Sequence, residues 1–197
     1  MKNLTMKNLT KAPCEQFLIK HDHLTKQGCG LRCGHNYGLF DENETLIGVA
    51  VFHMVSAPET VKGCFGITDQ KGIYELSRFA IDSEHDNPTL ASCFLTRCIY
   101  RLRKDTHVRA LIGYVDNRYE TGLLYQSTNF KYYGLTARRK DFFVVQADGT
   151  LKKQSRGKTK DIIGVWKPRS RKHRYLMIFD KTLKTLWKEE IYPNDTI

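Results

Sequence analysis

A polar stretch from Tyr74 to Arg97, YELSRFAIDSEHDNPTLASCFLTR, contains the first side chains that could do chemistry. Its pattern predicts a strand, a polar loop and the first turns of an amphipathic helix. Arg78 lies near the end of that strand, where its guanidinium could hold a phosphate or another polar group of a substrate. The alternative is a surface ion pair with Glu75 or Asp82, which contributes only about 0–1 kcal/mol.

The start of the predicted helix is a second place where a ligand could be held. Asn87 is a favourable N-cap residue, and Pro88 suits the first helical turn. The amide groups of that turn lack partners within the helix, and the helix dipole favours an anion beside them. Ser92 lies in the second turn. Its hydroxyl could contact a ligand phosphate, or the residue could simply fill a packing contact, and the sequence leaves both interpretations open.

Metal-ligand side chains crowd the stretch HDHLTKQGCGLRCGH, which contains His21, His23, Cys29, Cys33 and His35. Imidazole and thiolate groups suit zinc or iron. The spacing C-x3-C-x-H, however, is not that of a standard zinc finger. The alternative is a glycine-rich loop with incidental thiols. Of the five, His23 is the strongest candidate for a metal ligand or a catalytic group.

Positive charge is concentrated in the last third of the chain. Residues 1–130 hold 15 Lys and Arg against 14 Asp and Glu, whereas residues 131–197 hold 17 against 7. This asymmetry indicates a polyanionic partner, with nucleic acid first among the candidates. Four aromatic residues are interleaved with these charges, so we expect a folded basic surface rather than a floppy tail. They are Trp166, Tyr175, Phe179 and Trp187.

The elements that must position these residues alternate between strands and helices. Two β-rich runs flank the turn Asp41–Thr45 and predict a hairpin, and YELSRFAID, VRALIGYVD, NFKYYGL and DFFVVQA predict further strands. Helices are predicted at the end of the segment before His21, after Pro88 and within NRYETGLLYQSTNF. Residues 148–164 read as an exposed basic loop, and RYLMIF as one more short strand. This order predicts an α/β or α+β fold, with a mixed sheet flanked by helices.

The sequence also indicates the cellular compartment of the protein. It shows no secretory signal pattern and no apolar run as long as a membrane span. We therefore expect a soluble cytoplasmic protein whose six cysteines are reduced thiols. A length of 197 residues fits one domain, or one domain with an appendage.

Two features resemble the GNAT acyltransferase fold: the strand–loop–helix from Tyr74 to Lys104, and the segment GLLYQSTNF from Gly122 to Phe130. A narrower likeness rests on ELSRFAI, NPTLASCFL, GYVD, LLYQSTNF and KHRYLMIF, which occur in this order. Together they resemble the Mom-type DNA modification proteins of bacteriophages, over about residues 23–179.

This resemblance implies an enzyme that places a small acyl or carbamoyl group on N6 of adenine in phage DNA. In the family that group is understood to be methylcarbamoyl, and the product hides restriction sites from host nucleases. The resemblance further implies an acetyl-CoA or related acyl-CoA donor, double-stranded DNA as partner, a host-cell cytoplasmic setting and a bound iron, for which zinc is the alternative.

The same resemblance assigns roles to individual residues. Tyr125 is expected to protonate the departing CoA thiolate, a task for which a phenol is suited near neutral pH. Asp116 ends an apolar strand and is expected to take a proton from the adenine amine or to orient it. The alternative for Asp116 is a cap of the turn that follows. His23 is a third catalytic candidate. The candidates for holding the donor are Arg78, Ser92 and Asn87.

The basic segment KPRSRKHRYLMIF supplies the candidate DNA contacts, Arg169, Arg171, Lys172 and Arg174. Tyr132, Tyr133 or Trp166 could stack on an extruded base or could belong to the core. We expect residues 16–150 to form the GNAT-like domain, preceded by an N-terminal segment 1–15. Residues 151–197 are expected to form a basic C-terminal extension packed on that domain.

Two departures from the family pattern keep other functions open. The loop SEHDNPTLAS has no glycine and carries Glu84 and Asp86, whose charges would repel a pyrophosphate, and His23 is followed by Leu24 where relatives show Tyr. One alternative is a GNAT-like acyltransferase that acts on a protein or a small amine. The other is a catalytically inactive GNAT-like protein that binds DNA.

Overall fold

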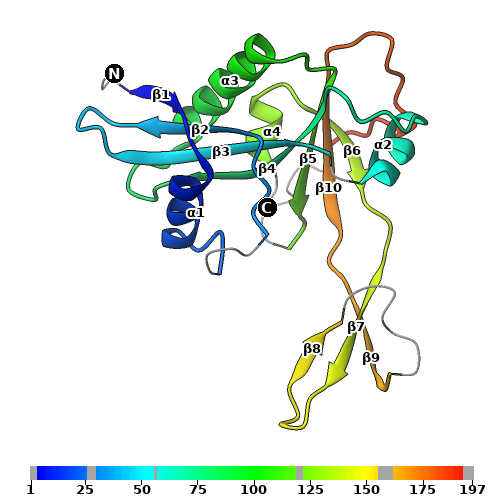
Figure 1. Cartoon of the computed structure of the whole chain (residues 1–197). Helices are drawn as coiled ribbons and strands as arrows, with labels where there is room; N and C mark the ends of the chain where they lie inside the picture. Colours follow the sequence, from blue (N-terminus) through cyan, green and yellow to red (C-terminus); the bar gives the residue numbers. More distant parts are fainter. Residues whose placement is uncertain (1–3, 26–29, 56, 119–121, 155–161, 193–197) are drawn as a thin grey trace.

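A computed structural model describes the whole chain except residues 1–3, 26–29, 56, 119–121, 155–161 and 193–197 (Figure 1). The elements are, in chain order, β1 (Thr5–Asn8), α1 (Lys11–Lys20), β2 (His35–Phe40), β3 (Leu46–Met54), α2 (Pro58–Phe65), β4 (Ile73–Ile81), α3 (Pro88–Asp105), β5 (Ala110–Asp116), α4 (Leu123–Ser127), β6 (Lys131–Leu135), β7 (Lys140–Val145), β8 (Leu151–Lys153), β9 (Gly164–Pro168) and β10 (Lys172–Ile178). None of the helices in this described part is both long and apolar enough to cross a bilayer.

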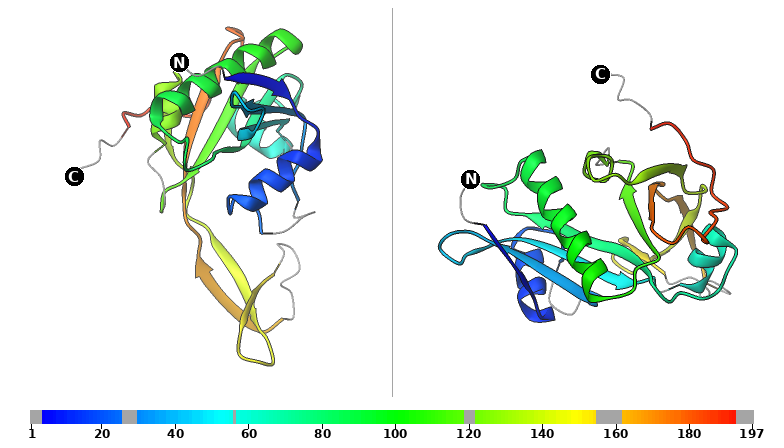
Figure 2. Two further views of the ribbon diagram at one scale, coloured as in Figure 1. Left: turned by 90° about the vertical axis from the view of Figure 1, so that its left-hand side faces the viewer. Right: turned by 90° about the horizontal axis from the view of Figure 1, so that it is seen from above.

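Seven strands form one mixed sheet in the order β1-β2-β3-β4-β5-β10-β6. β4 and β5 run parallel and are connected through α3, whereas the other neighbouring strands run antiparallel. Helices α3 and α4 pack on one face of the sheet, which we call the α3 face, and α1 and α2 pack on the other, the α1 face (Figure 2). The predicted fold class, a mixed sheet flanked by helices, is confirmed.

The core on the α3 face follows from the helical stripe seen in the sequence. Phe94, Leu95, Cys98 and Leu102 of α3 are at most 1% exposed and pack over the sheet. Burying an aliphatic or aromatic side chain of this size contributes about 1.5–3 kcal/mol. Asn87 begins the helix as predicted, because its side-chain oxygen accepts a hydrogen bond from the amide of Leu90 at 2.8 Å.

The sheet opens between β4 and β5. Their ladder runs from Ile73 opposite Ala110 to Leu76 opposite Gly113 and then stops. Ser77 is an extra residue in β4, since Leu76 lies opposite Phe52 and Arg78 lies opposite Val51. Such a bulge bends its strand. Beyond it, β4 stays paired with β3 and β5 stays paired with β10, so the two halves of the sheet separate.

A second, three-stranded sheet in the order β8-β7-β9 projects from the body on the continuations of β6 and β10 (Figure 1). The sequence had predicted that NFKYYGL and DFFVVQA form a final pair of strands. Both segments are strands, but they do not pair with each other: β6 pairs with β10, and β7 pairs with β8 and β9. The segment 148–164, predicted as a loop, contains β8. Helix α2 had not been predicted.

The predicted hairpin of β2 and β3 is confirmed, with the Asp41 carboxylate accepting hydrogen bonds from the amides of Asn43 and Thr45 across the turn. The predicted strand RYLMIF is formed, because all of it except Phe179 belongs to β10, which lies between β5 and the edge strand β6. The division of the chain at residues 15 and 150 stays a prediction. In the structure both β1 and β10 are strands of the main sheet.

Candidate functional site

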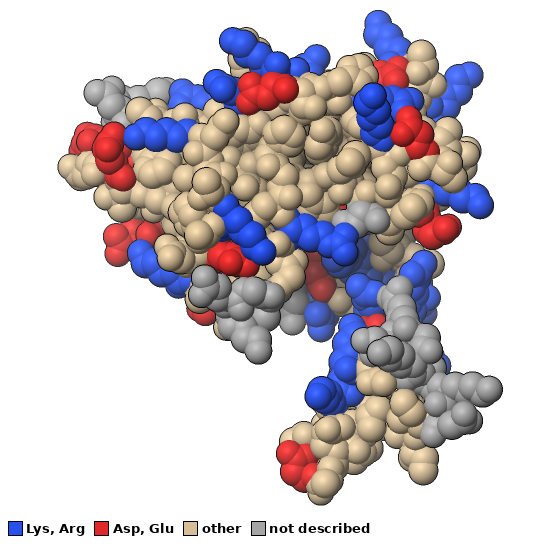
Figure 3. Space-filling view, viewed as in Figure 1, with Lys and Arg blue, Asp and Glu red and all other residues tan. Residues whose placement is uncertain are grey.

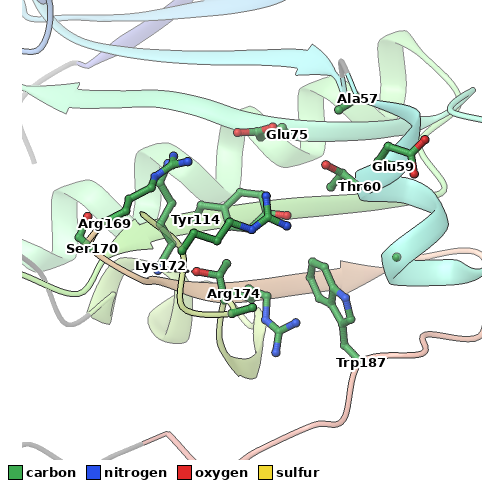
Figure 4. A pocket seen from close by; sticks show the side chains of 14 residues that line it. Ala57, Glu59, Thr60, Glu75, Tyr114, Arg169, Ser170, Lys172, Arg174 and Trp187 are labelled. Carbon is green, nitrogen blue, oxygen red and sulfur yellow. Dashed lines mark hydrogen bonds between the residues drawn. The ribbon is translucent and has the colours of Figure 1, made fainter. Parts of the chain in front are cut away.

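A groove of about 870 Å³ opens on the α1 face of the sheet (Figure 4). Helix α2 forms one side of it, strands β4, β5 and β10 form its floor, and the residues that follow β6 form the other side. The polar and aromatic side chains that line it include Glu75, Tyr114, Ser170, Lys172, Arg174 and Trp187.

Two aromatic rings lie in the groove beside two cations. The rings of Tyr114 and Trp187 meet edge to face, with centroids 6.5 Å apart. The Lys172 ammonium lies 5.9 Å from the Tyr114 ring, and the Arg174 guanidinium lies 4.6 Å from the Trp187 ring. Both cations are therefore placed for cation–π contact. Burial, followed by the charge of Glu75, raises the pKa of Tyr114, so its phenol stays neutral at physiological pH.

The positions of these residues follow from strand alternation. Tyr114 of β5 and Arg174 of β10 lie opposite each other in the antiparallel ladder, so their side chains share a face. Trp187 comes from the segment after β10, which is held in place because the amide of Leu186 donates to the carbonyl of Cys64 at the end of α2, at 2.7 Å. Six separate stretches of the chain thus build one groove.

Glu75 is the acidic group of the groove. It is half-buried on β4, one residue before the last paired position of the β4–β5 ladder, and faces the same side as Tyr114. Among the residues that the structure describes, none makes a hydrogen bond or ion pair with its carboxylate. A carboxylate in this state can accept a proton or a hydrogen bond from a ligand. The sequence had suggested Glu75 only as an ion-pair partner of Arg78.

Asp116 is held by several donors instead. Arg118 binds both carboxylate oxygens at 3.1 Å and donates its amide as well, and the Ser170 hydroxyl donates at 2.6 Å. Chiefly the Arg118 hydrogen bonds, and then that of Ser170, lower the pKa of Asp116 to about 2. So weak a base is poorly suited to take a proton. The geometry favours the cap that the sequence offered as its alternative, with Asp116 fixing Ser170 at the groove edge.

Arg78 lies on the α1 face, in register with Val51. One terminal nitrogen donates to the carbonyl of Ser77 at 2.6 Å, while the buried Nε atom has no hydrogen-bond partner among the residues that the structure describes. The surface ion pair that was its alternative is not formed with either Glu75 or Asp82 in this structure. Asp82 lies instead 3.7 Å from His21. A partly buried guanidinium with an unpaired nitrogen can bind an anionic or carbonyl group.

Tyr125 lies on the α3 face. Its ring packs directly on Gly113, where a Cβ atom would overlap it, and stacks on Tyr175 at 4.8 Å and an interplanar angle of 10°. The side chain is only 7% exposed. Tyr125 and Arg78 therefore lie on opposite faces of the sheet and do not meet in one open cleft. Because Gly113 is the last β5 residue paired with β4, Tyr125 lies beside the opening between the strands.

The start of α3 is already engaged by its own side chains. The Asn87 side chain caps the Leu90 amide, and the Ser92 hydroxyl donates to the carbonyl of Thr89 at 3.1 Å. A phosphate at this helix end would have to share or replace these contacts. Their assignment to the donor site stays a prediction.

The predicted iron or zinc site is not found. No group of three or more His, Cys, Asp or Glu side chains that could hold a metal occurs in the described part of the chain, although Cys29 lies outside it. His23 is exposed after the end of α1, where its amide donates to the carbonyl of Leu18. His21 packs its ring against Phe17 at 4.3 Å.

The basic candidates gather at and beside the groove. Arg169, Lys172 and Arg174 line it, and the Arg171 side chain donates to the carbonyl of Thr136 at 2.7 Å. Figure 3 shows Lys and Arg side chains collected where the three-stranded sheet leaves the body. Of the aromatic residues considered for stacking, Tyr132 and Tyr133 are buried, whereas Trp166 is 55% exposed on β9.

Comparison with known proteins agrees with this architecture. A family model described as the Mom protein family matches residues 3–194. No curated protein matches the chain.

Solved structures show the same fold at low identity. A GNAT family acetyltransferase from Elizabethkingia anophelis with acetyl-CoA bound superposes with a TM-score of 0.50 at 15% identity, over 91% of this chain and all of that one. The yncA protein of Salmonella typhimurium with its cofactor acetyl-CoA gives 0.52 at 14% identity, over 90% and 95%. A protein from Acinetobacter baylyi ADP1 described as an acetyltransferase gives 0.55 at 15% identity, over 91% and 95%.

Proposed function

The chain belongs to the Mom protein family and has the GNAT fold, and from this premise we propose that it transfers a small acyl or carbamoyl group to N6 of adenine in double-stranded DNA. One observation carries the proposal beyond the family. A basic groove lined by aromatic rings contains the Glu75 carboxylate, which has no partner in the described part of the chain, and this groove lies beside the opening between β4 and β5.

We assign the acyl-CoA donor to that opening. Two of the similar structures contain acetyl-CoA, and a thioester entering between β4 and β5 would reach from the start of α3 toward the groove. Asn87 and Ser92 at the helix start and Arg78 on β4 are the residues that would hold its phosphates and carbonyl. The amides at a helix N-terminus favour such an anion.

We assign the acceptor base to the groove on the α1 face. A base in a duplex must leave the stack before its exocyclic amine can react. The rings of Tyr114 and Trp187 offer surfaces on which it can stack, and each base–aromatic contact contributes about 1–3 kcal/mol. Lys172 and Arg174 attract the flanking phosphates. The groove volume of about 870 Å³ lies within the range of about 300–1,000 Å³ that is typical of ligand sites.

In the proposed reaction the N6 nitrogen attacks the carbonyl carbon of the thioester. A C–N bond forms, the C–S bond breaks, and the amine loses one proton while the thiolate gains one. The adenine amine is a poor nucleophile because its lone pair is delocalised into the ring. Glu75 accepts its proton, which would accelerate transfer by about 10²–10⁴. Tyr125, beside Gly113, is the proposed proton donor to the thiolate.

Mass spectrometry of nucleosides tests this function. DNA is isolated from cells that express the protein and is digested to nucleosides. Deoxyadenosine carrying an added acyl or carbamoyl group is expected, and it should be absent from cells that express Glu75→Gln at equal protein level. Unmodified deoxyadenosine in the presence of folded wild-type protein would contradict the proposal.

A second candidate, an inactive GNAT-like DNA-binding protein, is favoured by one local observation. The Asn87 side chain already occupies the Leu90 amide, and Glu84 and Asp86 place negative charge in the loop before α3. Isothermal titration with acetyl-CoA separates the two candidates. Heat of binding supports the enzyme, and no heat together with tight DNA binding supports the inactive protein. Acyl transfer to a protein or small amine instead predicts acetyl-CoA binding without DNA affinity.

A further inference from the structure

The projecting three-stranded sheet has a composition that the fold does not require. We call residues 138–154 and 162–169, which contain β7, β8 and β9, the arm. They hold seven Lys and Arg against two Asp and Glu, a net charge of +5 in 25 residues. Within its described residues, only Asp141 and Phe142 are buried. A sheet with so little buried surface adds little to the stability of the body.

The acidic groups described in the arm are already neutralised or engaged. Asp141 is paired with Lys153 at 2.6 Å and lies 4.0 Å from Arg169. Asp148 accepts the amide and the hydroxyl of Thr150 within a tight turn, at 2.9 and 2.6 Å. These hydrogen bonds lower the pKa of Asp148 and keep it charged. Neither carboxylate forms an ion pair with Lys140, Lys152 or Lys167.

Four lysines on the arm strands are exposed, and three of them, one on each strand, do not pair with Asp141. These three are Lys140 of β7, Lys152 of β8 and Lys167 of β9. No carboxylate in the described part of the chain lies within ion-pair distance of any of them. The Lys167 ammonium lies 5.8 Å from the centroid of the Phe143 ring. A cluster of unpaired cations on a projecting element is suited to the phosphates of a polyanion.

The arm and the groove form one continuous basic surface. Arg139 and Arg169 line the groove and flank the arm strands, just before β7 and just after β9, where the amide of Arg169 donates to the carbonyl of Arg139 at 2.8 Å. Figure 3 shows this run of Lys and Arg from the body onto the arm. A ligand that crosses the mouth of the groove and extends beyond it would therefore contact the arm. A single nucleotide would fill only the groove.

We propose that the arm is a second DNA-contacting element, which lies along the phosphate backbone of duplex DNA and holds the duplex while one adenine occupies the groove. This inference rests on the proposed function for its partner. It assigns Lys140, Lys152 and Lys167 to phosphate contacts and gives them no part in acyl transfer. A long, regularly spaced polyanion fits a projecting sheet whose charges are spread over three strands.

Salt dependence of DNA binding tests the arm. The full-length variant Lys140→Gln/Lys152→Gln/Lys167→Gln is compared with a charge-matched control, Lys71→Gln/Arg97→Gln/Lys104→Gln, whose residues are exposed on the body. A fluorescent 30-base-pair duplex is titrated between 50 and 200 mM KCl. Each lost phosphate contact lowers the slope of log K against log[salt] by about 0.9. Relative to wild type, we expect the magnitude of the slope to fall by about 2–3 for the arm variant and by less than about 1 for the control.

Further measurements separate failure of the arm from failure of the proposed function. Equal slopes for the two variants would overturn the arm alone, provided that wild-type protein still modifies adenine. Absence of modified adenine with a reduced slope for the arm variant would overturn the function and leave the arm as a DNA contact. Tighter binding of an A-form RNA duplex than of DNA would overturn the partner. Unchanged acetyl-CoA binding and melting temperature are expected for both variants, and Lys→Glu at the same arm positions should weaken DNA binding further.

Discussion

Glu75 and Asp116 are two carboxylates at one groove, and replacing each with its amide shows which of them takes the proton. Glu75→Gln keeps the size of the side chain and its ability to accept a hydrogen bond, but it removes the base. Because no described residue pairs with Glu75, we expect the free energy of unfolding to change by less than about 0.5 kcal/mol. Loss of a true general base should lower the transfer rate by about 10²–10⁴.

Asp116→Asn should have the opposite profile. It removes the two-oxygen ion pair with Arg118 and weakens the hydrogen bond from Ser170. Loss of such contacts should lower stability by about 1–3 kcal/mol. A carboxylate whose pKa is about 2 contributes little as a base at pH 7. We therefore expect less than about a tenfold fall in rate, which is under about 1.4 kcal/mol in activation free energy.

The assay follows the mass of a 30-base-pair duplex mixed with purified protein and acetyl-CoA under single-turnover conditions, with melting temperatures measured on the same samples. DNA affinity is measured separately, because Glu75→Gln should leave it unchanged or slightly stronger. A large fall in rate for Asp116→Asn without loss of stability, together with a nearly active Glu75→Gln, would refute the assignment. Asp116 would then be the base, as its position at the end of an apolar strand had suggested.

Three further results are expected. Gly113→Ala would place a methyl group where the ring of Tyr125 lies, and overpacking of this kind costs about 1–3 kcal/mol. The melting temperature and the transfer rate should both fall. An unchanged melting temperature would contradict the contact. The lowered pKa of Asp116 adds stability that is complete above its unfolded pKa of about 3.9 and is lost as the pH falls toward 2. When the free energy of unfolding is measured against pH, the difference between wild type and Asp116→Asn should therefore shrink over this range, by on the order of 1–2 kcal/mol. Asn87→Ala should cost about 1 kcal/mol in urea unfolding through loss of the cap, and the same variant should bind acetyl-CoA more weakly if the helix start holds the donor.

Local patterns were enough to predict the central elements. The stripe of apolar residues after Pro88 and the turn residues at Asp41–Thr45 act over a few positions, so the helix α3 and the β2–β3 hairpin could be read from the sequence. The family resemblance rested on the same short segments. The strand order was less accessible, because β10 enters the sheet between β5 and β6 from the far end of the chain.

The groove could not be predicted from sequence spacing, because its residues come from segments more than a hundred positions apart. Glu75 and Trp187 share it, and the Ser170 hydroxyl that holds Asp116 lies 54 residues from it. Strand alternation alone places Glu75 on the face opposite Leu76, but only the ladder with β5 shows that Tyr114 lies on that face as well. Helix α2 was missed because PETVKGCF is short and contains a glycine.

The central claim is that the acceptor is the exocyclic amine of adenine, and a pair of synthetic duplexes tests it most directly. One duplex contains adenine, and the other contains purine, which lacks the amine, at every adenine position. Each is incubated with wild-type protein and a small-molecule extract of host cells, and the intact strand masses are measured. If adenine N6 is the acceptor, we expect a discrete mass increase on the adenine duplex and none on the purine duplex. Equal increases on both, or none on either with protein that binds both duplexes, would contradict it.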